Sequence, residues 1–115
     1  MHEIGIANSV LDASVAECAR RSGVKLTRIG VRIGVLAGVD IEALRFAFEA
    51  LTKDTELEQV GIEIQSCPRR NRCLDCEEEF VSELYTEPCP KCASEHVILT
   101  GGEELDLAFI EVEEP

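Results

Sequence analysis

The stretch Cys73-Leu74-Asp75-Cys76, separated by twelve residues from Cys89-Pro90-Lys91-Cys92, decides the architecture of the second half of this chain. Two Cys-x-x-Cys pairs on short turns place four thiolates at the corners of a tetrahedron, which is the geometry that structural Zn²⁺ accepts. When protein ligands fill all four positions, none remains for water or substrate, which argues against catalysis at the metal. The pattern predicts a closed zinc site at Cys73, Cys76, Cys89 and Cys92.

Two other kinds of four-cysteine centre stay open at this point. A rubredoxin-like iron site uses similar pairs, but its turns usually carry Gly just after the second cysteine, where this chain has Glu77 and Ala93. A dithiol redox centre would leave the second pair without a use. Structural zinc is therefore favoured over both.

The charge of the chain narrows the classes of partner. Its 115 residues carry a formal net charge of -12, which disfavours nucleic-acid binding through a basic face. An acidic surface instead attracts cations or basic protein faces. Hydrophobic residues make up 45% and aromatics only 4%, so the chain can build a core, and that core should be aliphatic.

The sequence also predicts a cellular compartment. No apolar run approaches the roughly 20 residues that span a bilayer. The first residues lack a basic region followed by an apolar stretch, so no secretory signal is recognised. We therefore expect a cytoplasmic protein with no membrane contact, in which the six cysteines serve metal binding and not disulfides.

Hydrophobic periodicity predicts two helices in the first half of the chain. Residues 4–21 carry apolar side chains at spacings of three and four, namely Ile4, Ala7, Leu11, Val15 and Cys18. A second helix is expected over about 41–53, with Ile41, Leu44, Phe48 and Leu51 on one face. Asp40 precedes this helix and is suited to cap it.

Alternating side chains predict three strands. The first covers 26–36, the second contains Val60, Ile62 and Ile64, and the last covers about 104–113. The alternation of the last strand shifts between Phe109 and Ile110, so either a bulge lies there or both faces are covered.

An isolated last strand is not stable, so it should return to pair with the first two. The fold class is therefore predicted to be α+β, with two helices on a small three-stranded sheet and an inserted four-cysteine, zinc-ribbon-like domain. The main domain is expected to comprise residues 1–66 and 103–115, and the inserted domain residues 67–102.

A second metal site is indicated at the first residues of the chain. The Met1 amine, the backbone nitrogen of His2 and its imidazole can close chelate rings on one ion, and a nitrogen of Glu3 or a carboxylate oxygen can complete a planar site. Nitrogen-rich planar or tetragonal geometry favours Ni²⁺ or Cu²⁺ over Zn²⁺. A histidine at the second position is often uninformative, so these residues alone leave the site open.

Several segments together resemble the HypA/HybF family of nickel metallochaperones for hydrogenase maturation. The resemblance covers essentially the whole chain in order. It is carried by Met1-His2-Glu3, the segment Gly38-Val39-Asp40 before Glu42-Ala43-Leu44-Arg45-Phe46-Ala47-Phe48, the two cysteine pairs, and the ending Glu104-Leu105-Asp106-Leu107 with Ile110-Glu111-Val112-Glu113.

This resemblance implies a function and a set of site residues. It implies Ni(II) bound by His2, the Met1 amine and the Glu3 backbone nitrogen, with Asp40 as a further ligand or a group beside the ligands. It also implies the HypB GTPase and the large subunit of NiFe hydrogenase as partners, and urease as a client in some organisms. Family members often carry Gly at the position of Ala93, a departure that touches only the zinc turn.

The sequence thus predicts a metal carrier and not an enzyme. It binds Ni(II) at its N-terminus, delivers the ion for maturation of NiFe hydrogenase, and holds a structural Zn(II). The alternative is a zinc-ribbon adaptor that binds protein partners without handling nickel.

Overall fold

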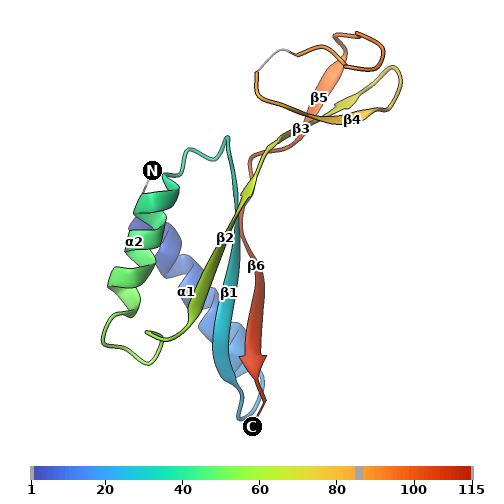
Figure 1. Ribbon diagram of the computed structural model, residues 1–115. Helices are drawn as coiled ribbons and strands as arrows, with labels where there is room; N and C mark the ends of the chain where they lie inside the picture. Colours follow the sequence, from blue (N-terminus) through green and yellow to red (C-terminus); the bar gives the residue numbers. More distant parts are fainter. Residues whose placement is uncertain (1, 85–86, 115) are drawn as a thin grey trace.

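The computed structural model describes residues 2–84 and 87–114 of the chain (Figure 1). It confirms the α+β class and the insertion of a four-cysteine module between two strands of the main sheet. The elements in chain order are α1 (Glu3–Ala19), β1 (Lys25–Gly34), α2 (Ile41–Thr52), β2 (Gly61–Cys67), β3 (Arg69–Cys73), β4 (Glu79–Ser82), β5 (Val97–Gly101) and β6 (Leu105–Glu113).

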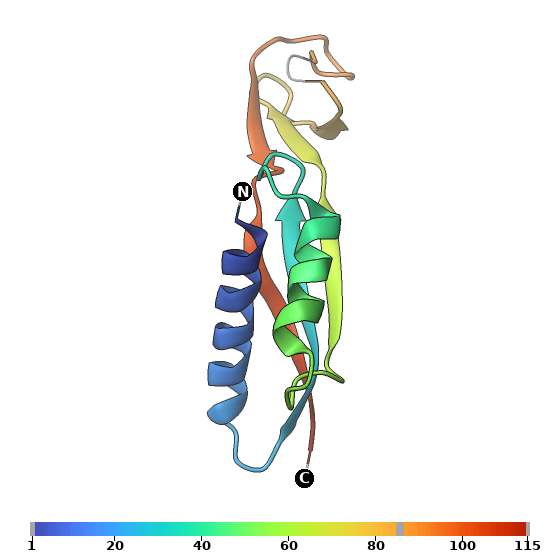
Figure 2. The ribbon, with the colours of Figure 1, turned by 90° about the vertical axis from the view of Figure 1, so that its left-hand side faces the viewer.

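The main sheet has the strand order β2-β1-β6. Strand β1 pairs in parallel with β2 and antiparallel with β6, so α2 forms the crossover between the two parallel strands. Both helices lie on the same face of this sheet (Figure 2). The last strand therefore returns to the main sheet, as predicted for a strand that is not stable alone.

The core lies between the helices and the main sheet and is mostly aliphatic. The central strand β1 buries Ile29, Val31 and Ile33 against the two helices, and α2 contributes Phe48, which is 1% exposed. The other buried members are Ala7, Val10, Leu11, Leu26, Leu44 and Ala47. Because the helices cover only one face of the sheet, Arg28 and Arg32 on the other face stay exposed, and β1 therefore alternates large aliphatic residues with polar ones.

One expectation for α1 is wrong. Ile4 and Val15 were predicted to lie on its apolar stripe, but they are 63% and 44% exposed. The buried face is centred on Ala7, Val10, Leu11 and Ser14. Ser14 takes a core position because its hydroxyl donates to the carbonyl of Val10 at 2.7 Å, so its burial leaves no polar atom without a partner.

The last strand contains the irregularity that its sequence predicts. Gly30 pairs with Phe109 and Val31 pairs with Leu107, so Ala108 is an extra residue in β6. The bulge lies one residue before the expected position. Because of it, Leu107 and Ile110 both pack against the core, although they are three residues apart.

The inserted module is a second sheet of order β4-β3-β5, joined to the main domain by two short connections. Backbone hydrogen bonds tie these connections to the end of β1: Val35 donates to Cys67 at 2.9 Å, and Leu36 donates to Gly102 at 2.7 Å. The molecule is elongated, with extents of 53 × 28 × 16 Å, and α1 begins at the end of the main domain nearer the module (Figures 1 and 2). Among the described helices, none has the length and apolar character needed to cross a membrane.

Candidate metal centre

The two cysteine pairs form turns with the same backbone hydrogen bonds. In the first turn, the Cys73 amide donates to the Glu78 carbonyl at 2.9 Å and Glu77 donates back to Cys73 at 3.0 Å. In the second turn the equivalent bonds run from Cys89 to Ser94 at 2.9 Å and from Ala93 to Cys89 at 2.8 Å. The two turns therefore present their thiols in the same way from opposite sides of one site.

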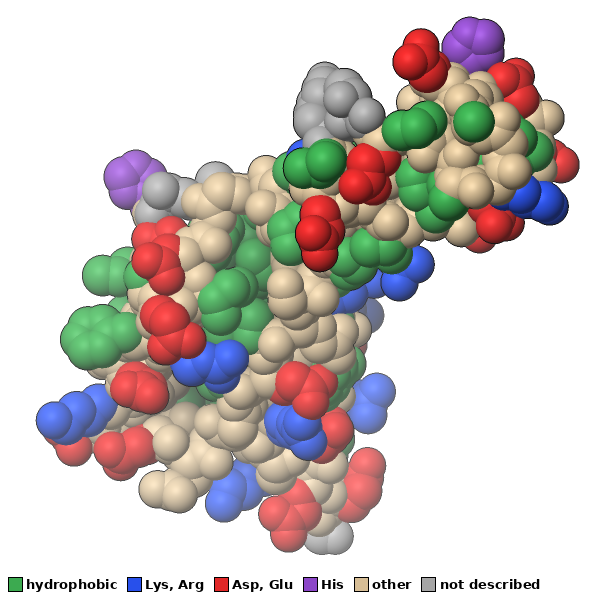
Figure 3. Space-filling view, turned by 45° about the horizontal axis from the view of Figure 1, so that its top comes forward, with side chains coloured by type: hydrophobic (Ala, Val, Ile, Leu, Met, Phe, Trp, Pro, Cys, Tyr) green, Lys and Arg blue, Asp and Glu red, His purple; other side chains and the backbone are tan. Residues whose placement is uncertain are grey.

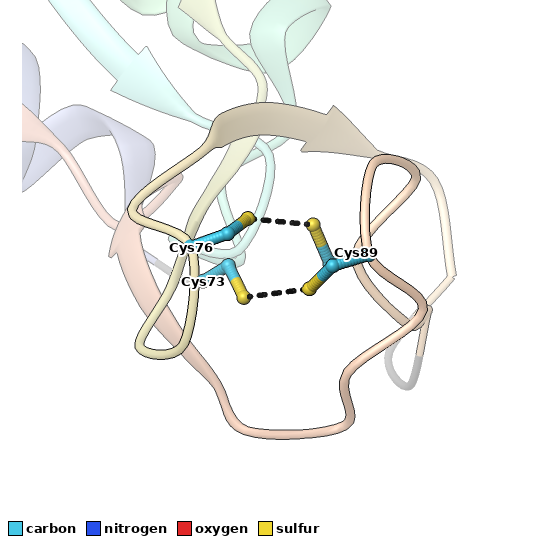
Figure 4. Close-up of side chains that lie close together, drawn as sticks. Cys73, Cys76 and Cys89 are labelled. Atoms are coloured by element: carbon cyan, nitrogen blue, oxygen red, sulfur yellow. Dashed lines mark hydrogen bonds between the residues drawn. The ribbon is translucent and has the colours of Figure 1, made fainter.

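The four sulfur atoms lie at the corners of a small cluster, within 4.8 Å of one another. Figure 4 shows the thiols of Cys73 and Cys76 pointing toward the second turn, which carries Cys89. The Sγ atoms of Cys73 and Cys92 are 3.6 Å apart, as are those of Cys76 and Cys89. Sulfurs bound at about 2.3 Å around tetrahedral Zn²⁺ are about 3.8 Å apart. The donor set fits such an ion in number, type and spacing.

The protein environment separates the acidities of these thiols. Hydrogen bonds from the backbone amides of Cys76 and Asp75 lower the pKa of Cys73 to about 7. A backbone hydrogen bond from Ser94 favours the Cys92 thiolate, but burial and the neighbouring sulfurs outweigh it and raise the Cys92 pKa to about 12. Four thiolates crowded this closely need a cation to be charged together.

A polar contact joins the two turns outside the sulfur cluster. The Ser94 hydroxyl donates to the Asp75 carboxylate, and Nδ1 of His96 lies 3.2 Å from the same carboxylate oxygen. The Ser94 hydroxyl also accepts the His96 backbone amide at 3.0 Å. Asp75 lies inside the first Cys-x-x-Cys pair, so these bonds hold the turns in register. Sequence reasoning left Asp75 and Ser94 out, because nothing in their spacing marks them as partners.

The residues predicted to bind nickel lie at the start of α1 and in the connection before α2. His2 is exposed and precedes the first residue of α1, without a side-chain capping bond. The carboxylate of Glu3 accepts the backbone amide of Asp40 at 3.2 Å, so these two residues are neighbours although 37 positions apart. Met1 lies outside the described residues.

Asp40 has the capping role that its position predicts. Its carboxylate accepts the amide of Ala43 at 3.1 Å and caps the N-terminus of α2. The structure thus brings Glu3 and Asp40 together and gathers the four cysteines at a separate place. It leaves the nickel ligands as a prediction.

The fold and the cysteine cluster define a small α+β protein with a metal-binding module inserted in its main sheet. The family model described as "Hydrogenase/urease nickel incorporation, metallochaperone, hypA" matches residues 1–112. The chain belongs to the HypA family, which is a family of metallochaperones and not of catalytic enzymes.

Individual relatives agree over their full length. The hydrogenase maturation factor HypA of Chlorobaculum parvum is 40% identical, over 98% of this chain and 100% of that protein. The HypA of Syntrophus aciditrophicus is 38% identical with the same coverage. The solution structure of the nickel metallochaperone HypA from Helicobacter pylori is similar over 100% of both chains, with a TM-score of 0.65 and 25% identity. Another HypA solution structure has a TM-score of 0.71 and 26% identity, and covers 100% of this chain and 98% of that one.

Proposed function

We propose that this protein carries Ni(II) at its N-terminal segment and delivers it for the maturation of NiFe hydrogenase. The observation that carries the proposal is the match to a nickel-incorporation family over residues 1–112, which begins at the predicted nickel segment. The relatives that this chain matches are hydrogenase maturation factors, and this chain carries the Met1-His2-Glu3 start and the cysteine pairs.

The surroundings of His2 support metal exchange at this position. Its side chain is exposed, and the first backbone amides of a helix have no partners within the helix. An imidazole nitrogen, the Met1 amine and deprotonated backbone nitrogens form the donor set that Ni²⁺ prefers. An exposed site at a chain terminus also allows the ligands to leave one after another, which suits transfer.

Asp40 is suited to position this segment. Its backbone amide binds the Glu3 carboxylate, so α1 begins against the end of the connection that leads to α2. A change in the N-terminal segment on nickel binding therefore reaches α2 through a direct contact. We infer that Asp40 acts beside the nickel ligands, as a further ligand or as a positioning group.

The four cysteines are assigned to a structural Zn(II). Their spacing fits a tetrahedral ion, and all four positions are filled by protein. Zinc bound there would join the two turns and so hold the inserted module together. The HypB GTPase and the large subunit of NiFe hydrogenase are the proposed partners, one in handling nickel and the other in receiving it.

The proposal is tested by blocking the N-terminus without touching a side chain. A Gly-Ser extension before Met1 removes the free amine, and we expect it to reduce nickel affinity by at least about 10- to 100-fold, the loss that follows when a group supporting a metal ligand is removed. The measurement is a calorimetric nickel titration of the untagged chain, with the same extension after Pro115 as the control. Equal nickel affinity in both extended chains would contradict the site, and no nickel binding by the untagged chain would favour the adaptor function.

A further inference from the structure

A groove of about 740 Å³ lies where the inserted module meets the main domain. Figure 3 shows hydrophobic and acidic side chains side by side at this junction. One side is formed by Leu36, in the turn after β1, and by Glu103, before β6. The inserted module supplies the rest of the lining through Asn71, Glu87, Pro88, Glu95, Val97 and Leu99, together with Arg69.

The floor of the groove is one face of the second sheet. In the register of that sheet, Asn71 pairs with both Phe80 and Leu99, and Cys73 pairs with Val97, so these side chains share a face. Asn71 is buried, and its amide nitrogen donates to the Ser82 hydroxyl at 2.8 Å, which ties this side chain to the neighbouring strand β4. Leu99 is 41% exposed and Val97 is half-buried, so these two side chains give the floor an apolar part that is open to solvent.

The rim of the groove is acidic. Glu87, Glu95 and Glu103 line it, against the single guanidinium of Arg69 among the described lining residues. Glu95 and Glu103 are exposed. The net charge of the whole chain, -12, has the same sign as the rim.

We propose that this groove binds an extended segment of a partner protein that carries apolar side chains flanked by Lys or Arg. The apolar floor would receive Leu-, Ile- or Val-like side chains, and the carboxylates would bind the cations beside them. Charge complementarity selects this occupant over an acidic peptide, because like charges across an interface oppose binding. A groove of this volume is within the range of small-ligand sites and accepts a few residues.

Binding in the groove has a structural consequence. Its lining comes from both parts of the molecule, so an occupant contacts Leu36 and Glu103 of the main domain together with β5 of the module. A bound segment would therefore fix the module against the domain. This inference does not depend on nickel, and its test contains none.

The test begins with an unbiased probe. Random eight-residue peptides displayed on phage are selected on the full-length protein as purified. We expect the enriched peptides to be rich in Lys or Arg and in aliphatic residues. Absence of enrichment, or enrichment of acidic or wholly polar peptides, would overturn the proposal.

The most strongly enriched peptide is then measured by fluorescence anisotropy against matched variants. Leu99→Ser removes the floor, and Ile98→Ser, on the opposite face of the same strand at 42% exposure, is its control. We expect binding of the peptide to weaken by at least about tenfold for Leu99→Ser and by less than about twofold for Ile98→Ser. Leu99 lines the groove and would contact the peptide, whereas Ile98 lies outside the groove.

A second pair of variants tests the rim without touching the apolar floor. Glu95→Lys/Glu103→Lys reverses two groove charges, whereas Glu56→Lys/Glu58→Lys makes the same change at exposed positions of the α2–β2 connection. We expect about tenfold weaker binding for the groove pair only, because rim charges act locally once salt screens them. Unchanged binding in the groove pair, or equal losses in both pairs, would refute the groove as the docking site.

Discussion

At the scale of single residues, the metal module contains two side chains in an unusual backbone conformation. Glu77 and Ala93 have φ values of 65° and 63°, and each follows the second cysteine of a pair. This left-handed region favours glycine, since a Cβ atom there costs roughly 1–2 kcal/mol. The paired hydrogen bonds of each turn hold the backbone in this conformation. The turns that position the thiols therefore contain backbone strain at Glu77 and Ala93.

The variant Ala93→Gly should relieve this strain. We expect it to raise the free energy of unfolding by about 0.5–1 kcal/mol, because the relief exceeds the added flexibility of the unfolded chain. Ala50→Gly, at an exposed position in the last turn of α2, is the matched control and should lower stability by up to about 1 kcal/mol. Thermal unfolding checks both variants, and a lower melting temperature for Ala93→Gly would contradict the account.

The thiols predict a pH dependence of metal binding. A thiol binds metal only as the thiolate, and the Cys73 pKa is about 7 while the Cys92 pKa is about 12 without metal. Around neutral pH, metal must therefore displace the Cys92 proton, so zinc affinity should rise steadily with pH from 6 to 9. Calorimetry in buffers of different ionisation enthalpy measures this release, and we expect at least one proton per zinc. Binding without proton release would show that the four thiols are not the ligands.

At the scale of elements, periodicity predicts the helices and strands because each buries one face. It predicts α2 best, since Leu44 and Phe48 are large and buried. It predicts Ala7 and Leu11 of α1 correctly but fails for the rest of that face, where Ser14 is buried while the larger Ile4 and Val15 are exposed. The hydroxyl of Ser14 is satisfied by the Val10 carbonyl, and a sequence pattern that weighs hydrophobicity alone overlooks a polar residue that is buried in this way.

The connection between the two sheets depends on a close backbone approach that the sequence does not reveal. A Cβ atom on Gly34 would lie 2.0 Å from the carbonyl oxygen of Gly102, so any side chain there forces the two segments apart. The amide of Gly34 also donates to Glu104 at 2.7 Å. The end of β1 therefore accepts only glycine at this position.

Gly34→Ala should destabilise the protein by about 2–3 kcal/mol, as for a severe overpacking. Gly61→Ala is the matched control, because a Cβ at Gly61 would meet its nearest atom, on Arg28, at an ordinary 3.6 Å. Urea unfolding compares the two variants. Similar urea midpoints for the two variants would show that the backbone around Gly34 and Gly102 moves apart at little cost in stability, which would contradict the account.

At the scale of the whole molecule, the two proposed metal sites differ in how far the sequence determines them. The four cysteines were found from spacing alone, because two short turns of fixed length already limit where the thiols point. Their gathering within 4.8 Å is what that spacing predicts. The bonds of Asp75 with Ser94 and His96 depend on how the turns face each other, which spacing does not encode.

The prediction of the N-terminal nickel site rests on family resemblance more than the prediction of the four-cysteine site does. His2 has chelating chemistry at any chain start, and only the match over residues 1–112 gives it a nickel context. Glu3 and Asp40 were both named from the sequence, and the structure shows that they are in contact. The nickel ligands stay a prediction, and they are the central claim of the account.

The measurement that tests this claim most directly is nickel and zinc analysis of the untagged protein beside its His2→Ala variant. After exposure to both metals and gel filtration, we expect the wild type to retain nickel and zinc, and His2→Ala to retain zinc alone with an unchanged circular dichroism spectrum. Cys92→Ser serves as the reciprocal control and should lose zinc. Nickel retained by His2→Ala at the wild-type level would contradict the assignment of the nickel site.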